Sequence, residues 1–303
     1  MAAKKGKIIT HPGSAHFDDI FATSLVIYKC SIDKNYPEIE VVHRKKPNKK
    51  ELEDPSIWKL DIGGKFNPKL KQFDHHPPVD PTEGVAKDQR QLLDECAFSL
   101  LLKDWGVWEK AKELYDWLEP SRIMDIRGPK GLVDEYEISY RAINSLESFI
   151  EQSVLTMFEK QDKIEPSEPL FNLLHFIGKH FFESILNYYE TLELVKEHAL
   201  FKTIKGVPVI HYPNTAKRTD MLTRVLKDKK DEKWGIGGIG IYPNTRPEGS
   251  IAAMRYEDDE RVDFTRIADY DHVIFTHPNG FIVALDSEIS DQELERYIQN
   301  AID

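Results

Sequence analysis

Cysteine is nearly absent from this sequence, whose 303 residues include only Cys30 and Cys96. The two cysteines are far apart and show none of the short spacings of a structural zinc site. A small secreted scaffold held by disulfides would contain many more cysteines. We therefore predict a reducing, cytoplasmic location and a structural role for both thiols.

Long hydrophobic runs are also missing. The longest apolar stretches are far too short to span a bilayer, and residues 1–7 lack the apolar core of a signal peptide. Hydrophobic residues make up 40% of the chain and charged residues 31%, which is typical of globular domains. The length suffices for one large or two medium-sized domains. The prediction is a globular protein that has no membrane partner.

Excess positive charge is also lacking, since 41 Lys and Arg are outnumbered by 52 Asp and Glu and the formal net charge is −11. This balance argues against a surface built for non-specific binding of duplex nucleic acid. A nucleic-acid substrate stays open, because bound metal ions would add local positive charge. One basic stretch, HRKKPNKK at 43–50, follows a predicted strand. It fits either a solvated loop or a rim that attracts phosphate.

Strand and helix patterns alternate in the first half of the chain. Short apolar strands are expected at 7–10, 39–42 and 57–61. Helical spacing is expected at 17–28, at 92–118 with a break near Gly106, at 138–163 and at 171–198. This alternation predicts an α/β fold with a mostly parallel sheet flanked by helices. The aromatic residues of 171–198 recur at helical spacing, so they favour a core or interface stripe over a base-stacking surface.

The pattern changes after residue 198, where short strands dominate. They are expected at 199–204, 207–212, 236–242, 251–256, 273–276 and 281–285. Helices are expected at 220–227 and at 291–301, the latter with a Ser290/Glu293 capping box. We therefore predict three parts: an N-terminal α/β domain at 1–135, a helical connector at 136–198 and a smaller α/β domain at 199–303.

Imidazoles and carboxylates gather where the predicted strands of the first domain end. His11, His16, Asp18 and Asp19 follow the first strand, Asp61 ends another, and the triplet Asp74-His75-His76 comes soon after. In sheets of this kind ligands bind beyond the carboxyl ends of the strands. Oxygen and nitrogen donors suit a hard or borderline divalent ion. The sequence therefore predicts a divalent-metal site at this edge.

These motifs resemble a known group of enzymes. The Asp-His-His triplet, together with the preceding His/Asp loop and the Asp-Ile-Gly-Gly strand end, resembles the DHH phosphoesterase superfamily. The stretch THPGSAHFDD at 10–19 is similar to the Thr-His-x-Gly-x-x-His-x-Asp-Glu pattern of one branch, the Myg family of metal-dependent hydrolases. FTHPNGFI at 275–282 is similar to the Phe-x-His-x-x-Gly-Phe-Ile signature of that branch. The segment 130–235 shows no motif of the family that we recognise.

The resemblance implies a site for two divalent ions, Mn²⁺ or Mg²⁺, that activate a water molecule. Asp61 would bridge the ions. His11 and His16 would complete one position, and Asp18 and His75 the other. A further aspartate ligand is expected, and Asp125 fits it best. Two assignments stay open. Asp19 stands where the branch has Glu and could replace Asp18, and Asp116 competes with Asp125.

The resemblance also implies substrate contacts. His76 would face the substrate phosphate, and Asp74 would orient its loop. Arg255, His277 and Gly280 would bind substrate from the C-terminal domain, although Arg255 could equally form a strand-end salt bridge. This chain departs from the branch at 94–98, where DECAF replaces a Ser-Ser-Ala-Gly helix start. If that helix start contacts substrate in the relatives, two acids there would change selectivity or repel phosphate.

The function implied by the resemblance is hydrolysis of phosphodiester bonds, with exonuclease activity on short single-stranded RNA or DNA as the leading hypothesis. A strongly acidic protein favours a short substrate over a long duplex. Two alternatives are a hydrolase of a small nucleotide or phosphorylated metabolite, and a non-catalytic protein that binds a ligand or a partner through 171–198. A homodimer is left open.

Overall fold

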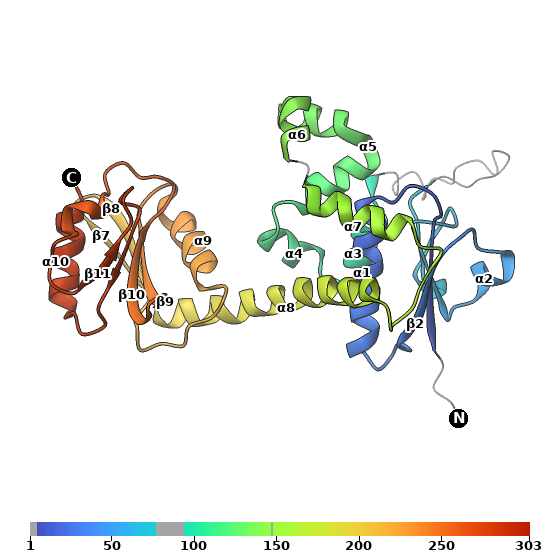
Figure 1. Cartoon of the computed structure of the whole chain (residues 1–303), viewed down its shortest axis with the longest axis horizontal. Coiled ribbons are helices and arrows are strands. Elements are labelled where there is room, and N and C mark those ends of the chain that lie inside the picture. Colours follow the sequence, from blue (N-terminus) through green and yellow to red (C-terminus); the bar gives the residue numbers. More distant parts are fainter. Residues whose placement is uncertain (1–4, 77–93, 147) are drawn as a thin grey trace. The chain divides into compact units, whose positions relative to one another are not determined.

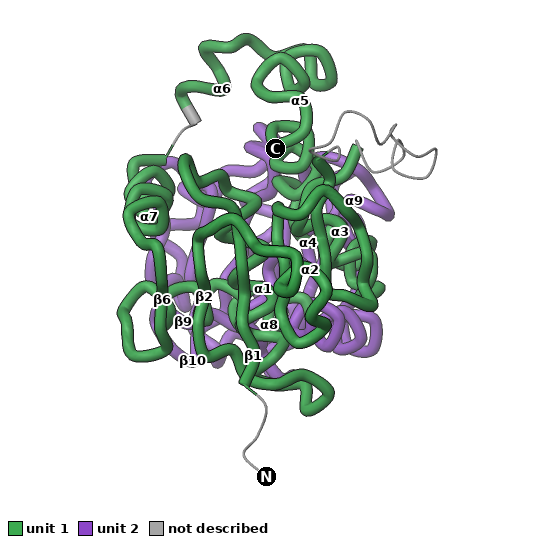
Figure 2. The backbone as a smooth tube through the Cα atoms, turned by 90° about the vertical axis from the view of Figure 1, so that its right-hand side faces the viewer, with its two compact units in different colours: residues 1–185 green, residues 186–303 purple. Residues whose placement is uncertain are grey.

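The structure, a computed structural model, describes residues 5–76, 94–146 and 148–303 (Figure 1). The chain divides into two compact units, residues 1–185 and 186–303, coloured green and purple in Figure 2. Their boundary lies inside one long helix, α8 (Pro169–His198). The division into three parts at residues 135 and 198 stays a prediction.

Unit 1 contains a six-stranded sheet in the order β4-β5-β3-β1-β2-β6. Its strands are β1 (Gly6–Thr10), β2 (Ile39–Arg44), β3 (Ile57–Leu60), β4 (Phe66–Asn67), β5 (Gln72–Phe73) and β6 (Lys163–Ile164). The four inner strands pair in parallel, and the two edge strands β4 and β6 pair antiparallel. The predicted α/β fold with a mostly parallel sheet is confirmed.

The register of this sheet brings three polar residues to one edge. The last residues of β1, β3 and β5 are aligned across the sheet. The residues that follow them are therefore His11, Asp61 and Asp74. Parallel pairing thus places side chains from three separate sequence motifs at the carboxyl ends of neighbouring strands.

Unit 1 also contains several helices. They are α1 (Phe17–Ile32), α2 (Lys49–Glu53), α3 (Ala97–Asp104), α4 (Trp108–Leu114), α5 (Leu118–Tyr136), α6 (Tyr140–Leu146), α7 (Phe149–Glu159) and the first half of α8, with a short 3₁₀ helix η1 (Pro68–Leu70). Of these, α1, α2 and α3 contact the sheet. In Figure 1, α1 and α3 lie on one side of the sheet and α2 on the other. Most of α1 is buried, because it packs against both the sheet and α3.

Two helix predictions in this unit need correction. The segment 118–136 forms α5, which the sequence did not predict because Gly128-Pro129 is typical of a turn. Gly128 has a left-handed backbone (φ 64°) that kinks the helix. The segment 138–163, expected as a single helix, contains two helices, α6 and α7. Its last residue already belongs to strand β6. The helix break expected near Gly106 is present, and residues 92–93 of that prediction lie outside the described residues.

Unit 2 is a smaller α/β unit around a second six-stranded sheet in the order β11-β12-β10-β9-β8-β7. Its elements are β7 (Leu200–Ile204), β8 (Val207–His211), α9 (Leu222–Trp234), β9 (Ile239–Thr245), β10 (Glu248–Arg255), η3 (Phe264–Ile267), β11 (Val273–Thr276), β12 (Ile282–Leu285) and α10 (Asp291–Ala301). In this sheet β8 and β9 pair in parallel, and the other neighbours pair antiparallel. Figure 1 shows α9 and α10 on opposite sides of it.

The aromatic stripe of α8 is mainly buried, as in a core. Phe171, Phe181 and Tyr188 are at most 8% exposed, whereas Phe176 is 60% exposed. None of the helices in the described ranges is both long and apolar enough to cross a membrane.

Candidate metal centre

The loop after β1 is tied to the start of α1 by Asp19. This fully buried carboxylate accepts hydrogen bonds from the Thr10 hydroxyl (2.5 Å) and from the backbone N–H of His16 (3.0 Å). His11 Nε2 lies 2.9 Å from Asp19 Oδ2. The hydrogen bond to Asp19 is the main reason that the pKa of His11 is raised to about 9. Asp19 therefore fixes both histidines of the first motif.

Arg44 holds the same loop from the neighbouring strand. Its guanidinium donates to the backbone oxygens of Gly13 (2.8 Å), Phe158 (3.3 Å) and Glu159 (2.8 Å). The residue is only 3% exposed and belongs to β2. Arg44 is therefore neither in a solvated loop nor on a basic rim, and at this position both expectations for 43–50 are wrong.

Asp61 occupies the middle of the centre. It is 3% exposed, directly follows the end of β3, and has a left-handed backbone (φ 54°). Its Oδ2 lies 3.5 Å from His11 Nε2, and its Oδ1 lies 3.4 Å from His75 Nε2 and 3.3 Å from His76 Nδ1. Among the described residues, no donor meets Oδ1 with hydrogen-bonding geometry. One carboxylate thus faces histidines from two motifs.

Burial disfavours the charged form of Asp61, but the neighbouring His75 and His76 outweigh it and lower the pKa of Asp61 to about 2. The carboxylate is therefore ionised at neutral pH. A buried anion with an oxygen that lacks a hydrogen bond is costly unless a cation compensates it.

Asp74 fixes the Asp-His-His loop. Its Oδ2 accepts a hydrogen bond from Gly64 N, and its Oδ1 accepts from the backbone N–H of His76 (3.0 Å). His76 Nδ1 also lies 2.9 Å from Asp74 Oδ1. The neighbouring carboxylates of Asp61 and Asp74 raise the pKa of His76 to about 11. The His76 side chain is 55% exposed, which leaves its other nitrogen outside these contacts.

A second group lies around the N-terminus of α3. Both oxygens of Asp18 accept backbone N–H bonds, from Ala97 (2.8 Å) and Phe98 (2.7 Å). On α5, Asp125 Oδ2 lies 3.3 Å from His75 Nε2. Burial, followed by the charge of Asp61, raises the pKa of Asp18, and the same causes raise that of Asp125 to about 6. Negative charge is thus concentrated here beyond what the described cations balance.

Three sets of metal-ligating atoms result, and within each set the atoms lie within 4.8 Å of one another. They are His11/His16/Asp19/Asp61, Asp61/His75/His76 and Asp18/Cys96/Asp125. All six residues predicted as ligands occur in these sets, and Asp61 is shared by two of them. A cavity of about 300 Å³ opens beside them, lined by the two loop histidines, Asp61, residues 62–64, Asp74 and His76. The donor set fits two adjacent divalent ions.

The structure shows which of the competing aspartates lie near the other predicted ligands. Their roles as metal ligands stay predictions. Asp125 contacts His75, and Asp116 is exposed and outside the three sets. Asp18 groups with Asp125, whereas Asp19 groups with His11 and His16. Asp125 lies inside α5, the helix that the sequence did not predict.

Sequence reasoning missed two residues of this centre. Cys96 is fully buried beside Asp18 and Asp125, although it was expected to be merely structural. Burial, followed by those two charges, raises the pKa of the Cys96 thiol. Arg44 was missed because it is the one arginine in a lysine-rich run. The available signal for Cys96 was its place at a helix start that departs from the family pattern.

The predicted substrate residues lie in unit 2. Arg255 Nη1 donates to Val262 O (2.9 Å), and its Nη2 is 3.5 Å from Asp258. His277 Nδ1 accepts from Asn279 N (3.1 Å). Gly280 has φ 64°, and a side chain there would collide with Asp263. Their substrate contacts stay predictions.

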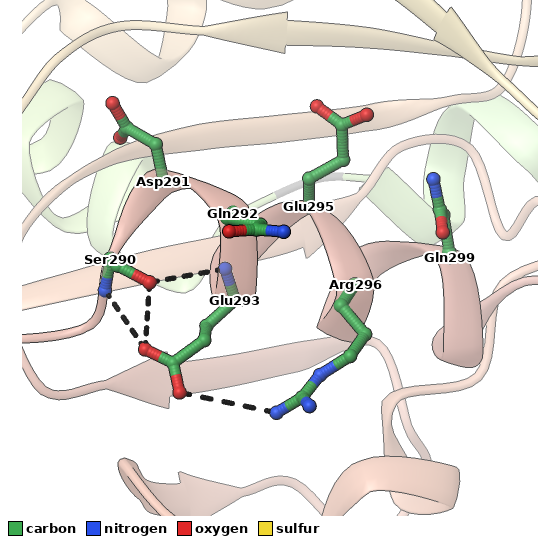
Figure 3. A pocket seen from close by; sticks show the side chains of 7 residues that line it. All are labelled: Ser290, Asp291, Gln292, Glu293, Glu295, Arg296 and Gln299. Atoms are coloured by element: carbon green, nitrogen blue, oxygen red, sulfur yellow. Dashed lines mark hydrogen bonds and ion pairs between the residues drawn. The ribbon is translucent and has the colours of Figure 1, made fainter.

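A hollow of about 830 Å³ on unit 2 lacks the features of such a centre. It is lined by Ser290, Asp291, Gln292, Glu293, Glu295, Arg296 and Gln299 (Figure 3). All seven belong to α10 or its N-cap, where Ser290 and Glu293 cap the helix and Arg296 lies 4.0 Å from Glu293. The hollow is formed by side chains on the surface of a single helix, and we assign no function to it.

Residues 7–82 match the sequence model of the uncharacterised protein family UPF0160, MYG1_exonuc. This confirms the resemblance drawn from the motifs for a segment that includes every predicted metal ligand except Asp125. A comparison with curated proteins found no match.

Solved structures with some likeness include a DHH domain from a member of a ribosomal protein family (12% identity, TM-score 0.35, 97% of this chain and 85% of the other). Others are the pGpG-specific phosphodiesterase PggH from Vibrio cholerae (11%, 0.26, 96% and 95%) and a putative family II inorganic pyrophosphatase from Methanococcus jannaschii (12%, 0.23, 97% and 99%). Scores this low do not support a functional conclusion.

Proposed function

We propose that the protein is a metal-dependent phosphoesterase that hydrolyses phosphodiester bonds, with exonuclease activity on short single-stranded RNA or DNA. The main support is Asp61, a buried carboxylate shared by two sets of metal-ligating atoms, whose Oδ1 lacks a hydrogen bond among the described residues. The family match over residues 7–82 supports a hydrolase of the DHH type.

The residues present fit a pair of divalent ions, Mn²⁺ or Mg²⁺. His11 and His16 would hold one ion and Asp18, His75 and Asp125 the other, with Asp61 between them. When bound, such a pair supplies Lewis-acid activation of water and neutralises charge that develops on the phosphate. The centre has more carboxylates than the described cations balance, and this excess negative charge suits bound divalent ions.

The other residues of the centre would position the reacting groups. The hydrogen bonds of Asp74 to Gly64 and His76 fix the loop that carries His76. Because Nδ1 faces the carboxylates of Asp61 and Asp74, the protonated His76 would offer Nε2–H to a phosphate oxygen. Arg255, His277 and Gly280 in unit 2 are proposed as further substrate-binding residues.

The cavity beside the ions suits one small group. Its volume of about 300 Å³ is at the low end for small-molecule sites, enough for a terminal nucleotide or a compact phosphate ester. This size also favours the second candidate function, hydrolysis of a small nucleotide or a phosphorylated metabolite. Substrate length separates the two, since only an exonuclease shortens an oligomer stepwise.

The decisive experiment is hydrolysis of a short end-labelled RNA oligomer with Mn²⁺, with Mg²⁺ and with a chelator. Stepwise, metal-dependent shortening is expected. The variant Asp61→Asn should lose at least ~100-fold in rate, because even outer-shell changes cost up to that much. Asparagine tolerates the left-handed backbone of residue 61, so the fold should persist.

The matched control is Asp116→Asn, the same chemical change at an exposed residue outside the three sets. It should leave the rate unchanged. Full Mn²⁺-dependent activity in Asp61→Asn would refute the assignment of the centre. Absence of RNA cleavage in a protein that binds two ions would favour the small substrate.

A further inference from the structure

Cys96 stands among carboxylates at the N-terminus of α3. The residue is fully buried, and its Sγ lies within 4.8 Å of a carboxylate oxygen of both Asp18 and Asp125. The first N–H groups of the helix are already satisfied by Asp18, which accepts from Ala97 and Phe98. Cysteine is also not among the preferred N-cap residues. Cys96 does form a capping box with Ser99, but a serine or aspartate would serve that role better, so helix capping alone does not explain why a thiol occupies this position.

Asp61, in the adjoining set of ligating atoms, independently indicates a cation next to this group. Its Oδ1 is buried and lacks a hydrogen bond among the described residues. His75 Nε2 lies 3.4 Å from this oxygen and 3.3 Å from Asp125 Oδ2. His75 Nε2 therefore lies between Asp61 Oδ1 and the group that contains Cys96. Donors from separate segments of the chain converge there.

We propose that Cys96 is a thiolate ligand of the second metal position, together with Asp18 and Asp125, and that this position takes a borderline, thiophilic divalent ion such as Zn²⁺ or Co²⁺. The inference rests on the proposed metal centre and adds to it a sulfur ligand that the family motif does not contain. The position therefore differs in chemistry from the His11/His16 position, whose ligands are nitrogen and oxygen only.

Ionisation of the thiol accompanies metal binding at such a position. When the ion binds, the Cys96 S–H bond breaks, its proton leaves to solvent, and a metal–sulfur bond forms. A thiolate and two carboxylates then carry three negative charges, two of which the divalent ion offsets. Sulfur selects Zn²⁺ and Co²⁺ over Mg²⁺, because Mg²⁺ prefers oxygen ligands. The protein would thus hold two chemically different ions side by side.

The test is a Co²⁺ titration of the metal-free full-length protein, followed by absorption spectroscopy. Wild type should show a thiolate-to-cobalt charge-transfer band in the near ultraviolet in addition to the weaker visible bands of bound Co²⁺. Cys96→Ser should lose the charge-transfer band but keep the visible bands, with about 10–100-fold weaker binding at one of two positions.

The matched control is Cys30→Ala, which removes the only other thiol, a buried one in α1 outside the three sets. It should keep the charge-transfer band. X-ray absorption of the wild-type protein loaded with Zn²⁺ gives an answer that needs no variant, since one sulfur at about 2.3 Å is expected.

Co²⁺ binding without a charge-transfer band, or zinc surrounded only by oxygen and nitrogen, would overturn the sulfur ligand and leave the metal centre standing. Loss of the band in Cys30→Ala would also overturn it. A wild-type protein that binds no divalent ion would overturn the proposed function itself.

Discussion

Single residues in the centre have local costs that their neighbours offset. Asp61 adopts a left-handed backbone, which costs a non-glycine residue on the order of 1–2 kcal/mol. It persists because its N–H donates to Phe73 O (2.9 Å), which links β3 to β5. Strain of this kind is concentrated at functional sites. The same conformation turns the carboxylate toward histidines of two motifs.

Arg44 is the residue whose loss should most affect the first loop. Arg44→Met removes three charge-assisted hydrogen bonds and leaves the oxygens of Gly13, Phe158 and Glu159 without their donor. We expect the free energy of unfolding to fall by about 2–3 kcal/mol. Urea denaturation of the metal-free protein measures it. The control Lys46→Met changes an exposed residue of the same basic run and should have little effect. An unchanged midpoint in Arg44→Met would contradict the role of Arg44.

At the scale of elements, α8 approaches α1 closely at one glycine. Gly178 of α8 lies against the backbone oxygen of Ser24 in α1, so closely that no side-chain carbon fits. Ser24 itself donates to Ile20 O (2.8 Å). A glycine in the middle of a long helix is unfavourable by roughly 1 kcal/mol, so a packing reason is required.

Gly178→Ala should therefore destabilise the protein, although alanine is the better helix former. Because a rigid backbone atom occupies the space, the helices must separate, at a cost of about 1–3 kcal/mol. Thermal unfolding followed by circular dichroism tests this. Asn172→Ala, at an exposed position of the same helix, serves as the control and should be neutral or slightly stabilising. A higher melting temperature for Gly178→Ala would show that the helices are not in close contact.

Element prediction succeeded where one pattern dominated. The alternation of strands and helices in the first half and α10 at 291–301 were found because apolar spacing and capping agree there. Helix α5 was missed, since Gly128-Pro129 is typical of a turn and only packing keeps both halves as one kinked helix. The missed strand β6 has two residues, too few for any periodicity.

At the scale of the whole molecule, the charges of the ligand residues link stability to pH. Asp125 has a pKa of about 6 in the folded protein against an ordinary 3.8, and His11 about 9 against 6.5. In both cases the folded state binds the proton more tightly. Each group therefore contributes most to stability when the pH is below its ordinary pKa. This contribution is lost as the pH rises through the pKa of the group in the folded protein.

The metal-free protein should consequently melt at a lower temperature near pH 9 than near pH 6. A divalent ion replaces the protons, so saturating Mn²⁺ should raise the melting temperature most at the higher pH. Differential scanning calorimetry with and without Mn²⁺ measures both effects. His11→Gln should reduce the fall, because its group no longer titrates. Equal melting temperatures at both pH values in the absence of metal would contradict the charge balance described here.

The sequence by itself determined the α/β class, the mostly parallel first sheet and which polar motifs follow its strands, because apolar periodicity and motif spacing are local properties. Only the tertiary structure decided which acids meet. Strand register placed His11, Asp61 and Asp74 at one edge, and helix packing brought Asp125 and Cys96 to His75 and Asp18. Such distances depend on contacts between residues far apart in the chain, and no local pattern encodes them.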